Sequence, residues 1–283
     1  MSIIRSINGL GGKFKVNVEI FNSTIECVEK SQTRTITDSQ FDNIEHRSMD
    51  KSWEGVRNYQ EALDLMRDGY DEEVSEMKKI ITKCENLKYE KRTTSKNDVC
   101  GFAPIVPLAL LRVPNAMINT YFKPVKSRIV SIYYDMSVNC GYSANQIISH
   151  GKKIVEAVIK LEHMGYRVEL NSVQTYNDKN SGDFLIVNVK KANQPLDLRR
   201  ISFSIIHPAM FRVIGFDWYS KFPLGKYRWG LGSSILSNLK GIEEVNKLMS
   251  EIVGSDAIFL SGEYISKHSV DYIVKHLEGG KCE

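Results

Sequence analysis

The stretch that decides the fold reads RIVSIYYDMSVN over residues 128–139, and after a turn it continues into a long segment that ends LEHMGYRVEL at 161–170. The apolar run 129–134 is typical of a strand covered on both faces. Apolar residues then recur at helical spacing from Ile147 to Leu161, with Ser143 and Asn145 as candidate caps. A second strand at 167–173 follows, so the stretch predicts a right-handed strand–helix–strand crossover.

The rest of the C-terminal half repeats this alternation. Short apolar runs at 184–189 and 257–260 predict two more strands, and amphipathic segments at 236–252 and 270–277 predict two more helices. Strands that alternate with helices are typical of a sheet with mostly parallel strands. We therefore expect residues 128–283 to form an α/β domain, a mainly parallel open sheet with helices on both faces.

The N-terminal part, residues 1–100, carries weaker signals. Residues 1–50 contain short β-prone runs, which predict either a hairpin against the main body or an arm that folds on a partner. Asn58 and Glu61 form a capping-box pattern before one amphipathic helix, and a second apolar stripe runs from Val74 to Leu87. The charged stretch 88–98 is a candidate linker. We take 1–100 as a β-prone arm followed by a helical pair.

Residues 101–127 contain four of the seven prolines of the chain. Proline at this density excludes a continuous helix or a central strand. The apolar residues between the prolines favour burial, so we expect an irregular apolar strap laid over the sheet or under the helical pair. The alternative is a hydrophobic docking segment for another protein, which the rarity of large exposed apolar patches on monomers makes the less favoured interpretation.

Composition narrows the functional classes. The net charge of +4 and pI of about 8.6 are mild, and they permit nucleic-acid binding without arguing for it. The first residues lack the apolar run of a signal peptide, and no run approaches the ~20 apolar residues of a membrane helix. Five cysteines, never closer than 16 positions, fit neither a zinc site nor a disulfide framework. We expect reduced thiols, a cytoplasmic location and no membrane partner.

One candidate site lies at the end of the first strand. Asp135, Ser137 and Asn139 alternate along the chain, and their oxygen atoms are of the kind that Mg²⁺ prefers. The carboxyl ends of parallel strands are also where open α/β sheets bind ligands. The competing interpretation is that these side chains cap the next helix or face solvent in a loop, and no third carboxylate can be assigned to the site.

A second candidate site lies in a glycine-rich loop, where cations and aromatic rings are interleaved at Lys221, Lys226, Tyr227, Arg228 and Trp229. Such a mixture can stack on single-stranded bases while it contacts phosphates. Tyr, Trp and Arg are also the usual anchors of protein interfaces. The loop therefore predicts a surface for nucleic acid or for a partner protein.

The strand edge Asp-x-Ser-x-Asn and the helix after it resemble the opening of von Willebrand factor A domains. Those are doubly wound sheets that bind proteins, often through a metal-ion-dependent adhesion site. The resemblance implies Mg²⁺ at a degenerate site, because Asn139 replaces the second Ser. The site also uses a later Thr and Asp, for which Thr175, Asp178, Asp197 and Asp217 are all candidates.

The order of motifs SWEGVRNYQEALDLMRDGY, GFAPIVPLALLRVPNAM, QPLDLRR and HPAMFRVIGFDW also resembles a family of uncharacterised proteins encoded by bacteriophages and mobile elements. This resemblance implies a viral protein working in the host cytoplasm and leaves a place in the virion open. Catalytic motifs such as G-x-S-x-G are absent from the sequence. We expect a non-enzymatic protein-interaction or assembly factor, with a nucleic-acid-binding accessory protein as the alternative and a metal-dependent hydrolase behind both.

Overall fold

The computed structural model describes residues 2–36, 44–84, 93–122, 128–178, 181–224, 239, 241–254 and 257–279. Its elements, in chain order, are β1 (Ile3–Gly9), β2 (Phe14–Phe21), α1 (Thr24–Gln32), η1 (Ile44–His46), α2 (Tyr59–Asp68), α3 (Asp71–Cys84), β3 (Thr93–Asp98), β4 (Ala103–Pro104), α4 (Val106–Leu110), β5 (Met117–Phe122), β6 (Ile129–Asp135), α5 (Ala144–His163), β7 (Arg167–Asp178), β8 (Ser181–Lys190), α6 (Leu198–Ile201), η2 (Ser202–Ile206), η3 (Met210–Gly215), α7 (Phe216–Ser220), α8 (Ile242–Val253), β9 (Ile258–Ser261), α9 (Gly262–Lys267) and α10 (Val270–Gly279). The chain is an α/β protein.

The central sheet has six described strands in the order β1-β2-β8-β7-β6-β9. The pairs β2–β8, β6–β7 and β6–β9 are parallel, whereas β1–β2 and β7–β8 are antiparallel. The sheet is therefore mixed, where the sequence predicted a mainly parallel one. Only two residues separate β7 from β8, and a connection that short allows only antiparallel pairing of neighbouring strands.

The strand–helix–strand unit at the centre of the sheet is confirmed. β6 pairs with β7 in parallel, from Ile129 opposite Arg167 to Asp135 opposite Val173. Ser143 caps α5 through a capping box with Gln146, as its place before the apolar stripe indicated. The stripe itself, from Ile147 to Leu161, is buried against the sheet.

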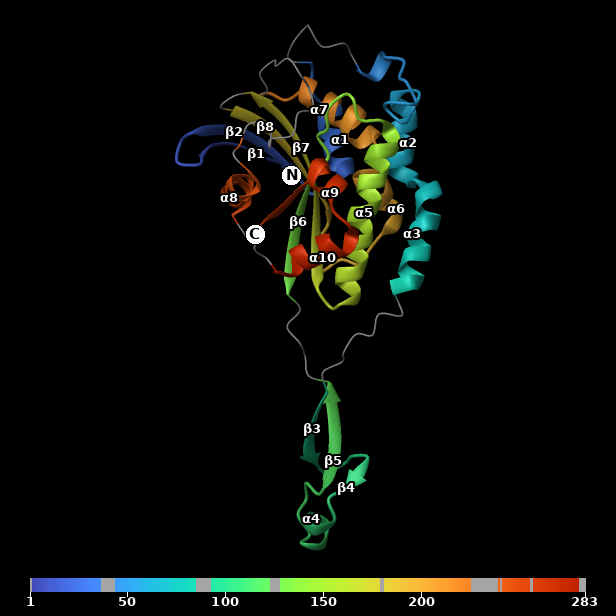
Figure 1. Cartoon of the computed structure of the whole chain (residues 1–283), viewed down its shortest axis with the longest axis vertical. Coiled ribbons are helices and arrows are strands. Elements are labelled where there is room, and N and C mark those ends of the chain that lie inside the picture. Colours follow the sequence, from blue (N-terminus) through green and yellow to red (C-terminus); the bar gives the residue numbers. More distant parts are fainter. Residues whose placement is uncertain are drawn as a thin grey trace.

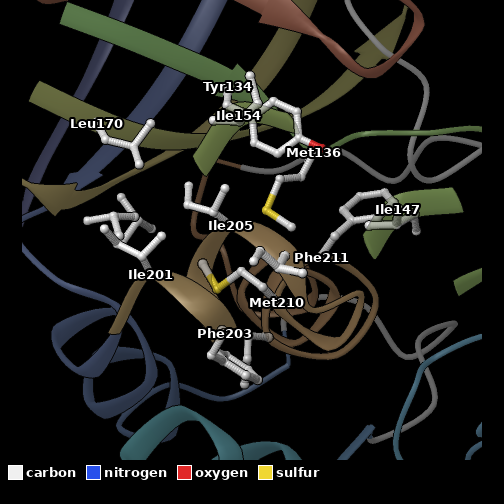
Figure 2. Close-up of a cluster of buried hydrophobic side chains, with 14 of the residues drawn as sticks. Tyr134, Met136, Ile147, Ile154, Leu170, Ile201, Phe203, Ile205, Met210 and Phe211 are labelled. Atoms are coloured by element: carbon white, nitrogen blue, oxygen red, sulfur yellow. The ribbon is translucent and has the colours of Figure 1, made fainter. Parts of the chain in front are cut away.

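Helices cover both faces of the sheet because successive residues of each strand point to opposite sides. On one side, Tyr134 and Met136 of the β6 end lie against Ile147 and Ile154 of α5 and against the residues of η2 and η3, as Figure 2 shows. On the other side, Tyr133 belongs to a separate core cluster that α8 covers. Figure 1 shows α8 apart from the helices that surround α5.

The N-terminal region belongs to the same sheet as the C-terminal half. β1 and β2 form the hairpin that was one of the two predictions for residues 1–50, and β2 then pairs in parallel with β8. Asn58 caps α2, because its side chain accepts a hydrogen bond from the Glu61 amide, and α3 follows α2 in the chain. A boundary at residue 100 therefore does not separate one folded unit from another.

Residues 198–220 form a run of short helices that is buried from Ile201 onward, and η2 and η3 within it are π-helical turns. Gly215 lies directly on the sheet, because a Cβ at this position would come within 1.5 Å of the Gln174 side chain. Gln174 in turn donates to the Met210 carbonyl at 2.9 Å, so the side chain of a sheet residue satisfies a backbone group of the widened helix.

Residues 93–122 stand apart from this body. Figure 1 shows β3, β4, α4 and β5 as a narrow projection along the long axis of the molecule. From here on, "the arm" means residues 93–122 alone, and not the β-prone N-terminal segment of the sequence analysis. Among the described residues, no helix is long and apolar enough to cross a membrane.

Candidate functional site

The backbone of the arm is ordered by its own hydrogen bonds. β5 lies between β3 and the two-residue strand β4, and it pairs antiparallel with both. The amides of Phe102 and Ile105 donate to the carbonyls of Ile118 and Ala116, at 3.0 and 2.7 Å. Gly101 passes so close to β5 that a Cβ there would lie 2.1 Å from the Ile118 oxygen, so only glycine fits.

The side chains of the arm, by contrast, are almost all open to solvent. Among residues 95–121, Ala116 alone is buried. Phe102 is 72% exposed, Leu110 is 79% exposed and Leu111 is 74% exposed. A small sheet with no apolar face packed against anything is marginal in water. The arm therefore presents an apolar surface that its own fold does not cover.

The arm carries little charge. Lys96, Asp98 and Arg112 are its only ionisable lysine, arginine and acidic side chains. Lys96 lies over the ring of Tyr121 at 4.4 Å, and Asp98 accepts a hydrogen bond from the neighbouring Val99 amide at 2.7 Å. Electrostatic attraction is thus a small part of what this surface offers, and a complementary surface has to be apolar.

This arrangement differs from the strap predicted for residues 101–127. Pro104 lies in an edge strand and Pro107 at the start of α4, where proline is tolerated. The prolines therefore fit a short, irregular module as well as a strap. The solvent exposure of Phe102, Leu110 and Leu111 favours the alternative, a docking segment.

The Asp135 edge is built from side chains that bind backbone amides. Asp135 Oδ1 accepts from the Ser137 amide at 2.9 Å, and Ser137 Oγ accepts from the Thr175 amide at 2.7 Å. Asn139 is exposed, and its Oδ1 accepts from the Gly141 amide at 2.9 Å. Asp135 and Ser137 are both buried. These contacts hold the turn between β6 and α5 and join it to β7.

The three residues are a poor fit for a metal ion as they lie here. β6 ends at Asp135, so Ser137 and Asn139 follow the strand instead of continuing its alternation. The described residues contain no group of three or more His, Cys, Asp or Glu side chains that could hold a metal. Mg²⁺ at this edge stays a prediction. The alternative, a cap of the next helix or a solvent-facing loop, also needs revision, because Ser143 caps α5 and the Asp135 and Ser137 side chains are buried.

The aromatic-basic loop can be followed only at its start, because Lys226, Tyr227, Arg228 and Trp229 lie outside the described residues. Lys221 is 4% exposed, and its Nζ lies 2.8 Å from Asp217 and 2.7 Å from Glu45. Burial raises the pKa of Asp217, although Lys221 acts in the opposite direction. As it lies here, the Lys221 ammonium is buried and paired twice, so it is not exposed for contact with nucleic acid or a partner, and the binding role of the loop stays a prediction.

The apolar residues at the tip of the arm are the ones that the sequence analysis placed incorrectly. Hydrophobicity alone predicted that Leu110 and Leu111 are buried. The available signal was the lack of any helical or alternating period between Pro104 and Pro114, since a segment without period has no face to turn toward its own core.

Comparison with known proteins adds a family but no activity. A search of curated proteins found no match, and a search of solved structures found none either. A family model described as a domain of unknown function, DUF7192, matches residues 7–277. That span covers both sheet halves and the arm, so the chain belongs to the DUF7192 family of domains of unknown function.

Proposed function

We propose that this protein is a non-enzymatic protein-interaction or assembly factor, and that the arm is the element that docks on its partner. The partner is another protein with an apolar groove that receives α4 and the residues around it. The observation that carries the proposal is the exposure of Phe102, Leu110 and Leu111 on a module whose backbone is nonetheless ordered.

Leaving these apolar side chains exposed to water costs free energy. Each large apolar side chain left in water forgoes about 1.5–3 kcal/mol relative to its buried state. Three such side chains lie within ten residues of one another, next to exposed Val106 and Val113. Contiguous exposed apolar surface of this kind marks interaction sites in soluble proteins. A short helix that enters an apolar groove is a recurrent way to cover it.

We propose, in addition, that the protein is related to von Willebrand factor A domains and is encoded by a bacteriophage or mobile element. The β6–α5–β7 crossover and the helices on both faces support a relation to von Willebrand factor A domains, which bind proteins. The order of sequence motifs supports an origin in a bacteriophage or mobile element, and the partner would then be a host or viral protein.

The test compares arm variants with a matched body variant. The double substitution Leu110→Asp, Leu111→Asp places two charges at the tip, and Ile3→Asp makes the same change at a body residue that is 57% exposed. Proteins that co-purify with the wild type and with Ile3→Asp from the native host, but not with the double variant, are candidate partners. The affinity of each is then measured with purified components.

The expected result is a purified heterologous partner whose affinity falls by at least about a hundredfold in the double variant, because two anchors are lost from the centre of the contact. Thermal unfolding should show that all three proteins are equally folded. A partner that binds the double variant as tightly as the wild type contradicts the proposal. So does a concentration-dependent dimer, abolished by the same variant, because the occupant of the surface would then be a second copy of the chain.

A further inference from the structure

A cavity of about 240 Å³ lies on the α1 side of the sheet, at the carboxyl ends of the adjacent parallel strands β2 and β8. The start of α1, the end of α2 and the segment around α6 surround it, and Figure 1 shows these three helices on the same side of the sheet as α5. Loops at the carboxyl ends of strands are where open α/β sheets bind ligands. The cavity is not part of the arm or of the Asp135 edge.

The rim of the cavity is rich in arginine. Arg67, Arg199 and Arg200 line it, opposed by Asp68 and Asp197. Asp197 Oδ1 already accepts from the amides of Arg199 and Arg200, at 3.1 and 3.3 Å, so its charge is directed at the start of α6.

The guanidinium groups of Arg67 and Arg200 are available to a ligand, whereas that of Arg199 lies near a carboxylate. Arg199 lies 3.7 Å from Asp71, with both side chains about 70% exposed. Within the part of the chain that the structure describes, neither Arg67 nor Arg200 forms an ion pair. Arginine presents a planar fork of donors that matches the oxygen atoms of a phosphate group.

The floor of the cavity supplies an independent observation. Thr24 and Ser204 both line the cavity, both are more than nine-tenths buried, and their hydroxyl oxygens lie 2.8 Å apart. Two hydroxyls share one hydrogen bond, so one O–H group donates and the other needs an acceptor elsewhere. Among the described residues, neither hydroxyl has a second partner, and both residues line the cavity. The second O–H group can therefore donate to an oxygen atom of a ligand in the cavity.

The first turn of α1 also makes the cavity favourable for an anion. Ser23 caps the nine-residue helix, and Ser23, Thr24 and Ile25 line the cavity, so the positive end of the helix dipole faces it. Positive charge at the rim and a donor at the floor both select for an anion that carries several oxygen atoms.

We propose that this cavity binds a phosphate group, free or on a small molecule, with Arg67 and Arg200 on its charged oxygens and the Thr24–Ser204 hydroxyl pair donating from the floor. A second cavity of about 170 Å³ shares Val189, Asp197 and Arg200 with the first. The two cavities therefore adjoin at Arg200, and the remainder of an esterified ligand can extend along Gln194 and Pro195.

The test is calorimetric titration of the full chain at low salt with three probes, namely inorganic phosphate, ribose 5-phosphate and adenosine monophosphate. Saturable binding of at least one probe is expected. Esters that bind more tightly than inorganic phosphate identify an organic phosphate as the ligand, and equal affinities identify free phosphate. No saturable binding of any probe overturns the proposal.

Variants separate the built site from diffuse surface charge. Arg200→Gln should weaken the bound probe by about tenfold or more. Thr24→Val with Ser204→Ala keeps the shapes of the side chains but removes both hydroxyls, and should weaken binding by about threefold to tenfold. Arg112→Gln, in the arm, removes one positive charge elsewhere and should leave binding unchanged. Equal losses in Arg200→Gln and Arg112→Gln, or none in the hydroxyl variant, overturn the assignment, with melting temperatures as the check on folding.

Discussion

His207 is a buried histidine that makes the stability of this protein depend on pH. Its Nδ1 accepts from the amide of Ala209, the residue just before η3, at 3.1 Å. Its ring stacks on Phe203 and meets the edge of Tyr70. Because the ring is 3% exposed, burial lowers its pKa from 6.5 to about 4, and Lys51 adds to the shift. The imidazole is neutral in the folded protein at pH 7.

The direction of the effect follows from where protons bind. Between pH 6.5 and about 4 the unfolded chain protonates this histidine while the folded chain does not, so protons favour unfolding. The contribution of His207 is fully present above pH 6.5 and is lost as the pH falls toward 4. At 1.36 kcal/mol per pKa unit, the full loss is about 3 kcal/mol.

The test replaces His207 by asparagine, whose side-chain oxygen can accept from the same amide without titrating. Urea unfolding of wild type and His207→Asn between pH 7 and pH 4 gives the free energy of unfolding at each pH. The substitution lowers stability at all pH values because the packing on Phe203 is lost. The decisive quantity is the slope, and we expect the wild type to lose about 3 kcal/mol more than the variant over this range. Equal slopes would refute the reasoning.

Two further predictions concern residues near α5. Lys153 Nζ donates to the carbonyls of Ile265 and His268 at the end of α9, at 3.0 and 3.1 Å. Lys153→Met should therefore lower the free energy of urea unfolding by about 1–3 kcal/mol, whereas Lys78→Met, at an exposed position, should stay within about 0.5 kcal/mol of wild type. Equal effects of the two substitutions would show that these two hydrogen bonds do not stabilise the fold. Asp135→Ala should lower the melting temperature by the same amount in Mg²⁺ and in EDTA, because it removes a hydrogen bond to the Ser137 amide. A shift with Mg²⁺ that only the wild type shows would instead establish the metal site.

The parts of the fold that could be predicted are those whose signals are local. Ser143 as the cap of α5 and the apolar stripe that follows it depend on residues close together in the sequence, and both appear in the structure as expected. The start of α2 at Asn58 has the same basis. Each depends on hydrogen bonds between residues a few positions apart, which sequence spacing determines.

What could not be predicted depends on partners far away in the chain. Lys153 is one of the polar residues between the apolar positions of α5, and nothing in its spacing indicates that it donates to carbonyls 112 and 115 residues away. Asp135 was placed correctly at the end of its strand, but its role depends on neighbouring amides, which no spacing reveals. Leu110 and Leu111 are hydrophobic, and only the position of the arm relative to the body shows that the protein's own core does not bury them.

The central claim, that the arm docks on another protein, is tested most directly by a photo-crosslinking residue at Leu110, with the same residue at Ile3 as the control. Both positions are exposed, and one is on the arm and the other on the body. Irradiation in the native host should give one prominent adduct from position 110, between this chain and a single different protein, and none of that adduct from position 3. No adduct from position 110, an adduct only with a second copy of the chain, or the same adducts from both positions would contradict the claim.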